Sequence, residues 1–135
     1  MLEQTPTATG RPEMDTGETH AVAQFLRRYL ITMVVLEGDD AGENILVTRL
    51  PFLIGRGKRA TMKIPHETVS RRHAQLRLSG DGRLEILDGG SSNGTFVNGE
   101  RVEAALLEDG DMIRFGSVRY QLVIEERGPM TYVAE

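Results

Sequence analysis

Small polar and cationic residues gather in three short stretches between residues 55 and 99. In chain order these stretches are Gly55-Arg56, then Ser70-Arg71-Arg72-His73, then Ser91-Ser92-Asn93-Gly94-Thr95-Phe96-Val97-Asn98-Gly99. Each stretch is typical of a loop and stands between apolar runs typical of strands. Guanidinium groups, hydroxyls and backbone N–H groups are the donors that hold an anion. The pattern therefore predicts one anion site, built from turns on a β scaffold and best suited to a phosphate group on another polypeptide.

Basic residues concentrate in the same part of the chain. Residues 56–72 hold six basic side chains and a single acidic one, Glu67, although the whole chain has a formal net charge of −4. A solvated basic face is the simplest interpretation of such a cluster, but here it coincides with the Gly-Arg and Ser-Arg-Arg-His motifs. The overlap favours a focused anion site. Because the rest of the chain is acidic, a nucleic-acid partner, which needs a broad basic surface, is not expected.

The composition argues against metal sites, disulfides and membrane insertion. The chain has no cysteine, and its three histidines, His20, His66 and His73, are widely spaced. We therefore expect no metal and no cofactor. No apolar run approaches the ~18 to 20 residues of a membrane span, and the first residues lack the basic and apolar segments of a secretory signal. These features favour a cytoplasmic protein without a membrane partner.

Short β runs separated by turn residues begin near Leu30. Gly80-Asp81-Gly82 and Asn98-Gly99 predict tight hairpins, because type I′ turns need positive φ angles. Many short strands at regular spacing predict an antiparallel β sandwich. The candidate strands are Leu30–Glu37, Asn44–Leu50, Phe52–Gly55, Met62–Ile64, His73–Ser79, Arg83–Asp88, Thr95–Val97, Met112–Phe115 and Val118–Ile124.

Four elements, in order and spacing, resemble the forkhead-associated (FHA) domain, in particular small bacterial proteins with a single such domain. They are Leu53-Ile54-Gly55-Arg56, Val69-Ser70-Arg71-Arg72-His73-Ala74, the run from Asp88 to Gly99, and Leu107-Glu108-Asp109-Gly110-Asp111-Met112-Ile113-Arg114-Phe115-Gly116. The resemblance implies an all-β fold, an eleven-strand antiparallel sandwich of the FHA/SMAD-like kind. It also implies that loops at one end of the sandwich bind phosphothreonine peptides in Ser/Thr-kinase signalling, without catalysis.

The resemblance assigns roles to five residues. Arg56, Ser70, Arg71 and Ser92 match the family positions that contact the phosphate, and Asn93 matches the position that holds the adjacent peptide backbone. The residue types suit these roles. A guanidinium can grip two phosphate oxygens at once, and an amide can donate and accept together.

Other residues are expected to shape the site or tune it. Gly55 allows a close approach of backbone and ligand, and His73 is expected to be a buried imidazole that holds Ser70 through hydrogen bonds between loops. Arg72 is expected to point away from the phosphate. Gly94, Thr95, Asn98 and Gly99 are expected to form the turn and hairpin, and Thr68, Gly116 and Ser117 are candidates for reading ligand residues beyond the phosphate.

Two other functions need comparison with phosphothreonine binding. Gly90-Ser91-Ser92-Asn93-Gly94 fits the G-x-S-x-G pattern of a hydrolase, but no histidine follows Ser92 and the next residues read as a strand, so we expect no enzyme. The serious alternative is a non-catalytic scaffold with a vestigial phosphate pocket, which binds partners through a face of the sandwich. Equal affinity for phosphorylated and plain peptides would favour that scaffold.

The expected organisation is a tail, one domain and a second tail. Residues 1–29 are expected to be disordered, with either a short helix or an extended lead-in at 21–29, residues 30–125 to form the FHA domain, and residues 126–135 to form a C-terminal tail. Expected partners are phosphothreonine proteins, among them a Ser/Thr kinase or its substrates. A phosphorylated threonine of the N-terminal segment is a candidate intramolecular ligand; the segment holds Thr5, Thr7, Thr16 and Thr19.

Overall fold

The computed structural model describes residues 11–128, with side chains described from residue 20 onward. This part of the chain forms one helix followed by eleven strands. The elements are α1 (Arg11–Arg28), β1 (Tyr29–Val35), β2 (Asn44–Leu46), β3 (Phe52–Gly55), β4 (Met62–Lys63), β5 (Ala74–Leu78), β6 (Leu84–Asp88), β7 (Thr95–Val97), β8 (Glu100–Val102), β9 (Ala104–Leu106), β10 (Met112–Phe115) and β11 (Val118–Glu126). Residues 11–128 contain no helix with the length and apolar character needed to cross a bilayer.

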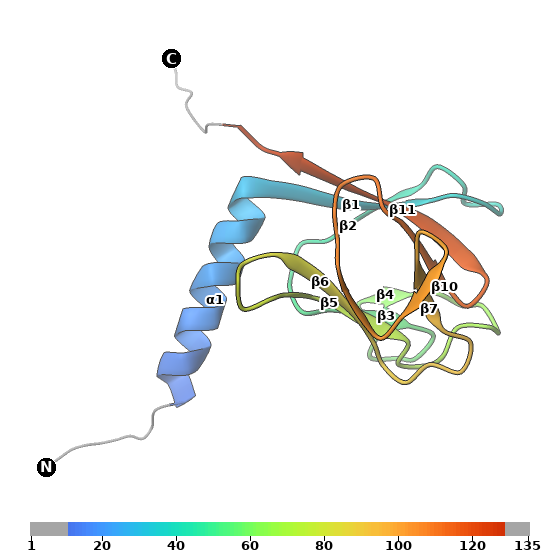
Figure 1. The fold of residues 1–135 in the computed structure, drawn as a ribbon, viewed down its shortest axis with the longest axis horizontal. Helices are drawn as coiled ribbons and strands as arrows, with labels where there is room; N and C mark the ends of the chain where they lie inside the picture. The colour runs from blue at the N-terminus through green and yellow to red at the C-terminus, as the bar shows by residue number, and fades with distance from the viewer. Residues whose placement is uncertain (1–10, 129–135) are drawn as a thin grey trace, which may run out of the picture.

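Two sheets pack face to face and form a sandwich (Figure 1). One sheet has six strands in the order β2-β1-β11-β10-β7-β8, and the other has five in the order β4-β3-β5-β6-β9. The longest pairing joins β1 to β11, from Tyr29 opposite Glu126 to Val35 opposite Tyr120. The β sandwich predicted from strand spacing, and the eleven strands implied by the family resemblance, are both confirmed.

One strand pair departs from the antiparallel arrangement that we expected. β3 and β4 are parallel, with Ile54 opposite Met62 and Gly55 opposite Lys63. The loop between them folds back along β3, because the amide of Thr61 donates to the carbonyl of Leu53 at 2.7 Å. β4 then leaves in the same direction as β3. The β3–β4 loop, which carries Arg56, Lys58 and Arg59, therefore lies beside β3.

The core lies between the two sheets and is built by alternation along the strands. Inward side chains are buried and most of their neighbours along the strands are more exposed, as the period of two in a strand requires, although Thr32 is buried between Ile31 and Met33. The six-stranded sheet contributes Ile31, Met33, Ile113, Phe115 and Leu122, and the five-stranded sheet contributes Phe52, Ile54, Leu76, Leu84 and Ile86. This rigid double layer supports the loops at its ends.

The N-terminal segment contains more helix than the sequence suggested. α1 reaches back to Arg11, into residues expected to be disordered, whereas we expected at most a short helix at 21–29. Its C-terminal turn is anchored: Phe25 and Leu26 pack partly buried against the core, and the Arg127 side chain donates to the Leu26 carbonyl at 3.0 Å. An anchored turn removes the cost of nucleation, so helix extends from it readily. Residues 1–10 and 129–135 of the expected tails lie outside the described residues.

Strand pairing extends slightly beyond the expected domain. Tyr29 and Glu126 already pair, one residue outside the limits of 30 and 125 at each end. α1 leaves the sandwich at this end of β1 and β11 (Figure 1). The turn before β11, Gly116-Ser117, lies at the opposite end of that strand. The candidate site residues gather around that turn.

Candidate functional site

Four loops meet at the end of the sandwich opposite α1. They are the β3–β4 loop (residues 56–61), the β4–β5 loop (64–73), the β6–β7 loop (89–94) and the β10–β11 turn (116–117). Backbone bonds join them: the amide of Arg56 donates to the carbonyl of Ser70 at 3.0 Å, and the amide of Gly116 donates to the carbonyl of Gly94 at 3.0 Å. The loops therefore form one connected surface.

Arg56 is exposed, but its guanidinium is oriented. Its Nε donates to the carbonyl of Val69 at 2.9 Å. The two terminal nitrogens have no hydrogen-bond partner in the part of the chain that the structure describes. Because the guanidinium is planar, fixing Nε also fixes the fork of donors on its far side. Arg56 thus presents an oriented pair of N–H groups to the solvent.

Gly55 serves the contact between two loops. A Cβ at this position would lie 2.1 Å from the carbonyl oxygen of Arg71 and 3.0 Å from that of Ser70. We expected a close approach of backbone and ligand here. The structure shows that the group in close approach is the backbone of the β4–β5 loop. Gly55 therefore sets the distance between Arg56 and the Ser70-Arg71 pair.

His73 is fully buried and joins two loops. Its Nδ1 accepts from the amide of Ser70 at 3.0 Å, and its Nε2 lies 2.9 Å from the carbonyl oxygen of Gly94. An N–H donor on one side and a carbonyl acceptor on the other assign the proton to Nε2. Both ring nitrogens are occupied, so this imidazole cannot serve as a general base for a nearby serine. Its geometry is that of a strut between the β4–β5 and β6–β7 loops.

Ser70 and Ser92 join those same two loops. The amide of Ser92 donates to Oγ of Ser70 at 3.1 Å. A hydroxyl that accepts one bond still has its own proton to donate. Ser92 is exposed, and its side chain has no hydrogen-bond partner within residues 20–128. Each of these adjoining residues therefore keeps a hydroxyl proton to donate.

Asp88, which belongs to a predicted motif but was not among the predicted site residues, organises the β6–β7 loop. Its carboxylate accepts from the amides of Gly90 and Ser91 at 2.9 and 3.0 Å, and from the hydroxyls of Ser91 and Thr95 at 2.6 and 2.7 Å. Burial raises the pKa of Asp88, but the hydrogen bonds from Ser91, Thr95 and Gly90 outweigh it, and the pKa lies below its usual range. This charged hub fixes the loop that carries Ser92. The signal for it was an acidic residue directly followed by small donor residues.

Asn93 reaches across to the β4–β5 loop. Its Nδ2 donates to the carbonyl of Thr68 at 2.8 Å. Oδ1 and the second Nδ2 proton have no partner in residues 20–128, so one acceptor and one donor stay available to a ligand backbone. The side chain is exposed at the rim of the loops.

Thr68, Gly116 and Ser117, predicted as specificity positions, lie together. Oγ1 of Thr68 lies 3.0 Å from Oγ of Ser117 and accepts from the Ser117 amide at 3.0 Å. A Cβ on Gly116, whose φ is +59°, would lie 2.4 Å from the carbonyl oxygen of Thr68. These residues form a hydroxyl cluster on the side of Asn93, and Arg114 donates to the Gly116 carbonyl of the same turn at 2.6 Å.

The remaining predicted residues shape the loops. Asn98 and Gly99 both have positive φ, 51° and 88°, and form the β7–β8 hairpin turn. Asn98 also bonds to Asp111 and to the Met112 amide, both at 2.9 Å. Gly94 has a φ of 93°, and its carbonyl accepts from Nε2 of His73. The structure thus brings Arg56, Ser70, Arg71, Ser92 and Asn93 to one end, while Asn98 and Gly99 lie in the hairpin beyond it.

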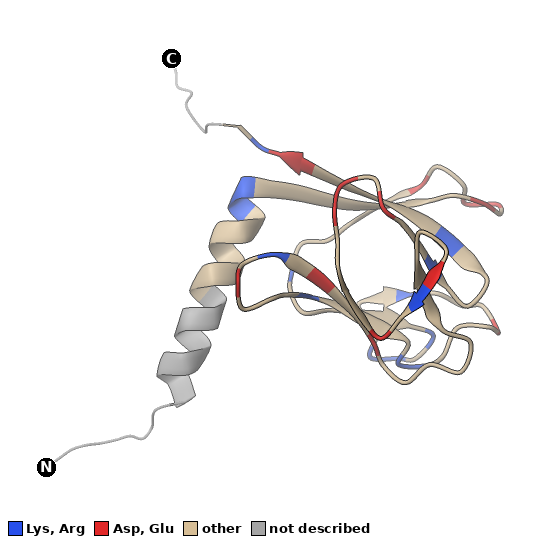
Figure 2. Ribbon diagram, viewed as in Figure 1, with Lys and Arg blue, Asp and Glu red and all other residues tan. Residues whose placement is uncertain are grey.

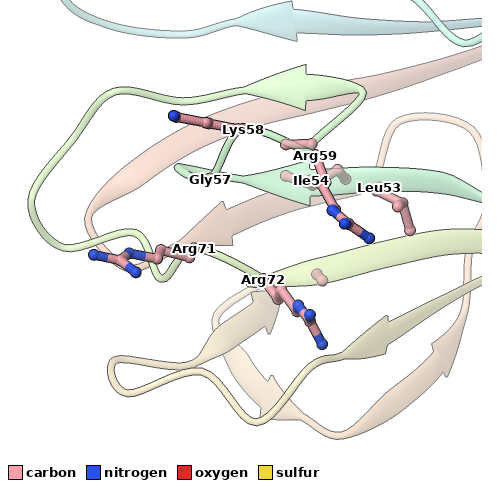
Figure 3. A pocket seen from close by; sticks show the side chains of 9 residues that line it. Leu53, Ile54, Gly57, Lys58, Arg59, Arg71 and Arg72 are labelled. Carbon is pink, nitrogen blue, oxygen red and sulfur yellow. The ribbon is translucent and has the colours of Figure 1, made fainter.

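At this end of the sandwich the β3–β4 and β4–β5 loops carry lysine and arginine, whereas the β1–β2 loop (residues 36–43) carries acidic residues (Figure 2). Arg71 lies against the β3–β4 loop, since its carbonyl accepts from the amide of Gly57 at 3.1 Å. Arg72 is exposed, and its side chain extends in a different direction from that of Arg71 (Figure 3). Among the described residues no group of three or more histidine, cysteine, aspartate or glutamate side chains could hold a metal ion. The site is an array of fixed donors in a positive field, which suits a multiply charged anion.

Comparison with known proteins gives a consistent identification. Residues 52–116 match the family model described as FHA domain. The chain is 34% identical over 119 residues to the oxoglutarate dehydrogenase inhibitor of Corynebacterium glutamicum, covering 88% of this chain and 79% of that protein. It is 40% identical over 87 residues to the glycogen accumulation regulator GarA of Mycolicibacterium smegmatis, covering 64% of this chain but only 54% of that regulator.

A solved structure agrees with these relatives. An FHA domain from a structural and functional study of phosphothreonine-dependent FHA domain interactions superimposes with a TM-score of 0.62 at 33% identity, covering 70% of this chain and 95% of that domain. The sequence relatives are named for regulation and inhibition, which agrees with the expectation of a non-catalytic module.

Proposed function

This chain belongs to the forkhead-associated (FHA) family, and we propose that it binds phosphothreonine segments of partner proteins through the loops at one end of its sandwich. The observation that carries the proposal is the convergence of oriented donors without partners. Arg56 is fixed through Nε with its terminal nitrogens unpaired among the described residues, its amide donates to the Ser70 carbonyl, and the Ser70 hydroxyl in turn accepts from the Ser92 amide. No acidic side chain of the described residues pairs with these donors.

The roles of the donors follow from their geometry. The oriented fork of Arg56 grips two phosphate oxygens, and the hydroxyls of Ser70 and Ser92 bind the phosphate from the other loops. Arg71 adds a second cation at the rim. Four or five charge-assisted bonds of ~1.5 to 3 kcal/mol each, reduced by ordering and desolvation, leave roughly 8 kcal/mol, which corresponds to micromolar affinity.

The peptide that carries the phosphothreonine continues past Asn93. The amide groups of Asn93 that are unpaired within residues 20–128 bond to the ligand backbone next to the phosphothreonine. The hydroxyls of Thr68 and Ser117 face the ligand residues beyond it. Because Thr68 and Ser117 carry no charge, and the guanidinium of Arg114 is engaged by the Gly116 carbonyl and the Phe96 ring, we expect no strong acidic preference on that side of the ligand. His73 and Asp88 bind no ligand; they hold the loops that do.

A titration of one threonine peptide, in phosphorylated and plain form, tests the proposal. We expect micromolar binding of the phosphorylated form and no measurable binding of the plain form at the same concentrations. A scaffold with a vestigial pocket would bind both forms equally, and that result would refute phosphothreonine recognition.

Regulation by binding is the function that fits these properties. The relatives are named as an inhibitor of oxoglutarate dehydrogenase and a regulator of glycogen accumulation. By analogy this chain, acting in the cytoplasm, binds a Ser/Thr kinase or its phosphorylated substrates and changes the activity of an enzyme partner. Affinity capture with wild-type protein and with Arg56→Ala, before and after phosphatase treatment of the lysate, tests this. Partners captured equally by both proteins would count against it.

A phosphorylated N-terminal threonine is a further proposed ligand, and the fold constrains how it docks. α1 leaves the sandwich at the Tyr29–Glu126 end, and the nine residues of β11 separate that end from the site by about 30 Å. Thr7 precedes Arg11 by four residues, a reach of about 14 Å. With α1 intact, such a ligand therefore docks into a second copy, and docking into its own pocket requires α1 to unwind. Phosphorylation of the full chain should then produce either dimers in size-exclusion chromatography or a loss of helical circular dichroism.

A further inference from the structure

A cationic groove lies on the outer face of the five-stranded sheet, beside the site. It has a volume of about 500 Å³ and is lined by β3, the β3–β4 loop, the end of the β4–β5 loop and the start of β5 (Figure 3). Its charged side chains are Lys58, Arg59, Arg71 and Arg72, and no acidic residue lines it. We call these residues, with the apolar side chains between them, the basic groove.

The cations of the basic groove are not neutralised by the protein. The ion pairs of the described residues are Arg28–Glu126, Arg77–Glu85, Arg83–Glu108 and Arg119–Glu37, and none includes a groove residue. This is notable in a chain of net charge −4, in which acids outnumber bases. Uncompensated like charges gathered in a concave surface repel one another and raise the local potential for an anionic ligand.

The floor of the groove is apolar. Leu53 is 41% exposed there, although it is a large hydrophobic side chain on a strand, and Ala60 and Ala74 flank it. In Figure 3 the side chains of Arg59 and Arg72 extend toward the Leu53 side, and that of Arg71 extends to the opposite side. A ligand for this surface therefore carries both negative charge and an apolar side chain. A polypeptide segment has that combination.

The groove continues from the phosphate site on one side only. Gly57 and Arg71 belong to the groove, and they directly follow Arg56 and Ser70 in the chain. On the other side of the phosphate donors lie the hydroxyls of Thr68 and Ser117. The cation bonded to that turn, Arg114, is held by the protein: it donates to the Gly116 carbonyl at 2.6 Å and lies 3.8 Å from the centre of the Phe96 ring. A peptide held at its phosphothreonine thus meets hydroxyls and an engaged arginine on one flank, and several cations without an ion-pair partner among the described residues on the other.

We propose that the basic groove is a second subsite, which binds an acidic segment of the same polypeptide that carries the phosphothreonine. The proposal rests on the proposed function and extends it from the phosphate to the sequence around it. Acidic side chains pair with Arg59 and Arg72, and an apolar side chain between them packs on Leu53. An extended nucleic acid is disfavoured, because the positive charge is confined to these loops while the rest of the chain is acidic.

Three phosphothreonine peptides of equal length test the subsite. One has neutral flanks, one has three glutamates with a leucine on the N-terminal flank, and one has them on the C-terminal flank. Two or three exposed ion pairs predict about tenfold tighter binding for one of the two acidic peptides, with the gain lost at high salt. The groove variant is Arg59→Ala with Arg72→Ala. Its matched control is Arg49→Ala with Arg83→Ala, two exposed arginines that do not line the groove.

The outcomes separate the two proposals. We expect the groove variant to bind the neutral phosphopeptide like the wild type but to lose the tenfold gain, while the control variant keeps it. If no phosphopeptide binds the wild type, the proposed function itself fails. If the neutral peptide binds but neither acidic peptide binds more tightly, or the groove variant keeps the gain, only the subsite is refuted. Loss of neutral-peptide binding in the groove variant, or tighter binding of duplex DNA than of the acidic phosphopeptides, also refutes it.

Discussion

The most informative perturbation away from the ligand donors is His73→Ala. The substitution removes an imidazole with no exposed surface, together with its bonds to the amide of Ser70 and the carbonyl of Gly94. It also removes an edge-on contact with Phe115, whose ring centroid lies 5.6 Å from that of the imidazole. The change therefore affects both folding and the geometry of the site.

The magnitude follows from these contacts. Each lost hydrogen bond leaves a poorly solvated partner, at about 1 to 2 kcal/mol apiece, and the lost packing adds about 1 to 2 kcal/mol. The expected loss is about 3 to 6 kcal/mol, against a typical domain stability of ~5 to 15 kcal/mol. The variant should thus fold, with a smaller free energy of unfolding.

Urea unfolding followed by circular dichroism measures this loss, and phosphopeptide titration at low temperature measures the effect on the site. We expect the affinity of folded His73→Ala to fall at least about tenfold, because Ser70 is no longer held and Ser92 bonds to Ser70. The matched control is His20→Ala, an exposed histidine on α1, whose stability should change by less than about 0.5 kcal/mol. If His73→Ala lowers the free energy of unfolding by less than about 1 kcal/mol, or if the folded variant keeps wild-type affinity, His73 does not hold the two loops in place.

Three further predictions concern other parts of the site. Arg56→Ala should abolish phosphopeptide binding while costing only about 1 kcal/mol of stability, since Arg56 donates one bond to the protein; a melt that shows loss of the fold would make it structural. Gly55→Ala should destabilise by more than about 2 kcal/mol because its Cβ meets the Arg71 carbonyl, whereas Gly80→Ala, with nothing within 4 Å, should be nearly neutral in urea unfolding. The pKa of Asp88 is lower in the folded state than in the unfolded chain, so the stability it contributes is complete above the unfolded pKa and is lost as pH falls through the folded pKa, below about pH 4. Asp88→Asn should therefore weaken the fall of the free energy of unfolding with acid. The same fall in the variant as in the wild type would contradict the role given to Asp88.

Much of the scaffold could be predicted because its signals are local. β3 and β7 have the predicted bounds, and the Asn98-Gly99 turn has the positive φ angles that its residue types favour. The hydrophobic pattern of the sequence did not predict β8 and β9. Each has three residues, mostly exposed and drawn from glutamate, arginine, alanine and single aliphatic residues, so neither alternation nor β propensity marks them. Pairing with β7 and β6, not intrinsic preference, makes them strands.

The sequence indicated which residues gather at this end of the sandwich, but not the hydrogen bonds and close contacts that hold them there. The types and order of Arg56, Ser70 and Ser92 pointed to an anion site, yet nothing local says that Asp88 collects four donors or that Gly55 makes room for Arg71. Such contacts join residues brought together only by the packed loops. The extent of α1 was also hidden, since its anchor is a contact with Arg127 about a hundred positions along the chain.

The central claim is recognition of a phosphate by fixed donors, and one measurement tests it most directly. The full chain is titrated calorimetrically with a single threonine peptide in phosphorylated and plain form, at pH 7.5 and again at pH 5.5, at two salt concentrations. We predict micromolar binding of the phosphorylated form only, weaker below about pH 6 as the phosphate loses its second charge, and weaker at high salt. Equal binding of the two forms, or an affinity that changes with neither pH nor salt, would contradict the account.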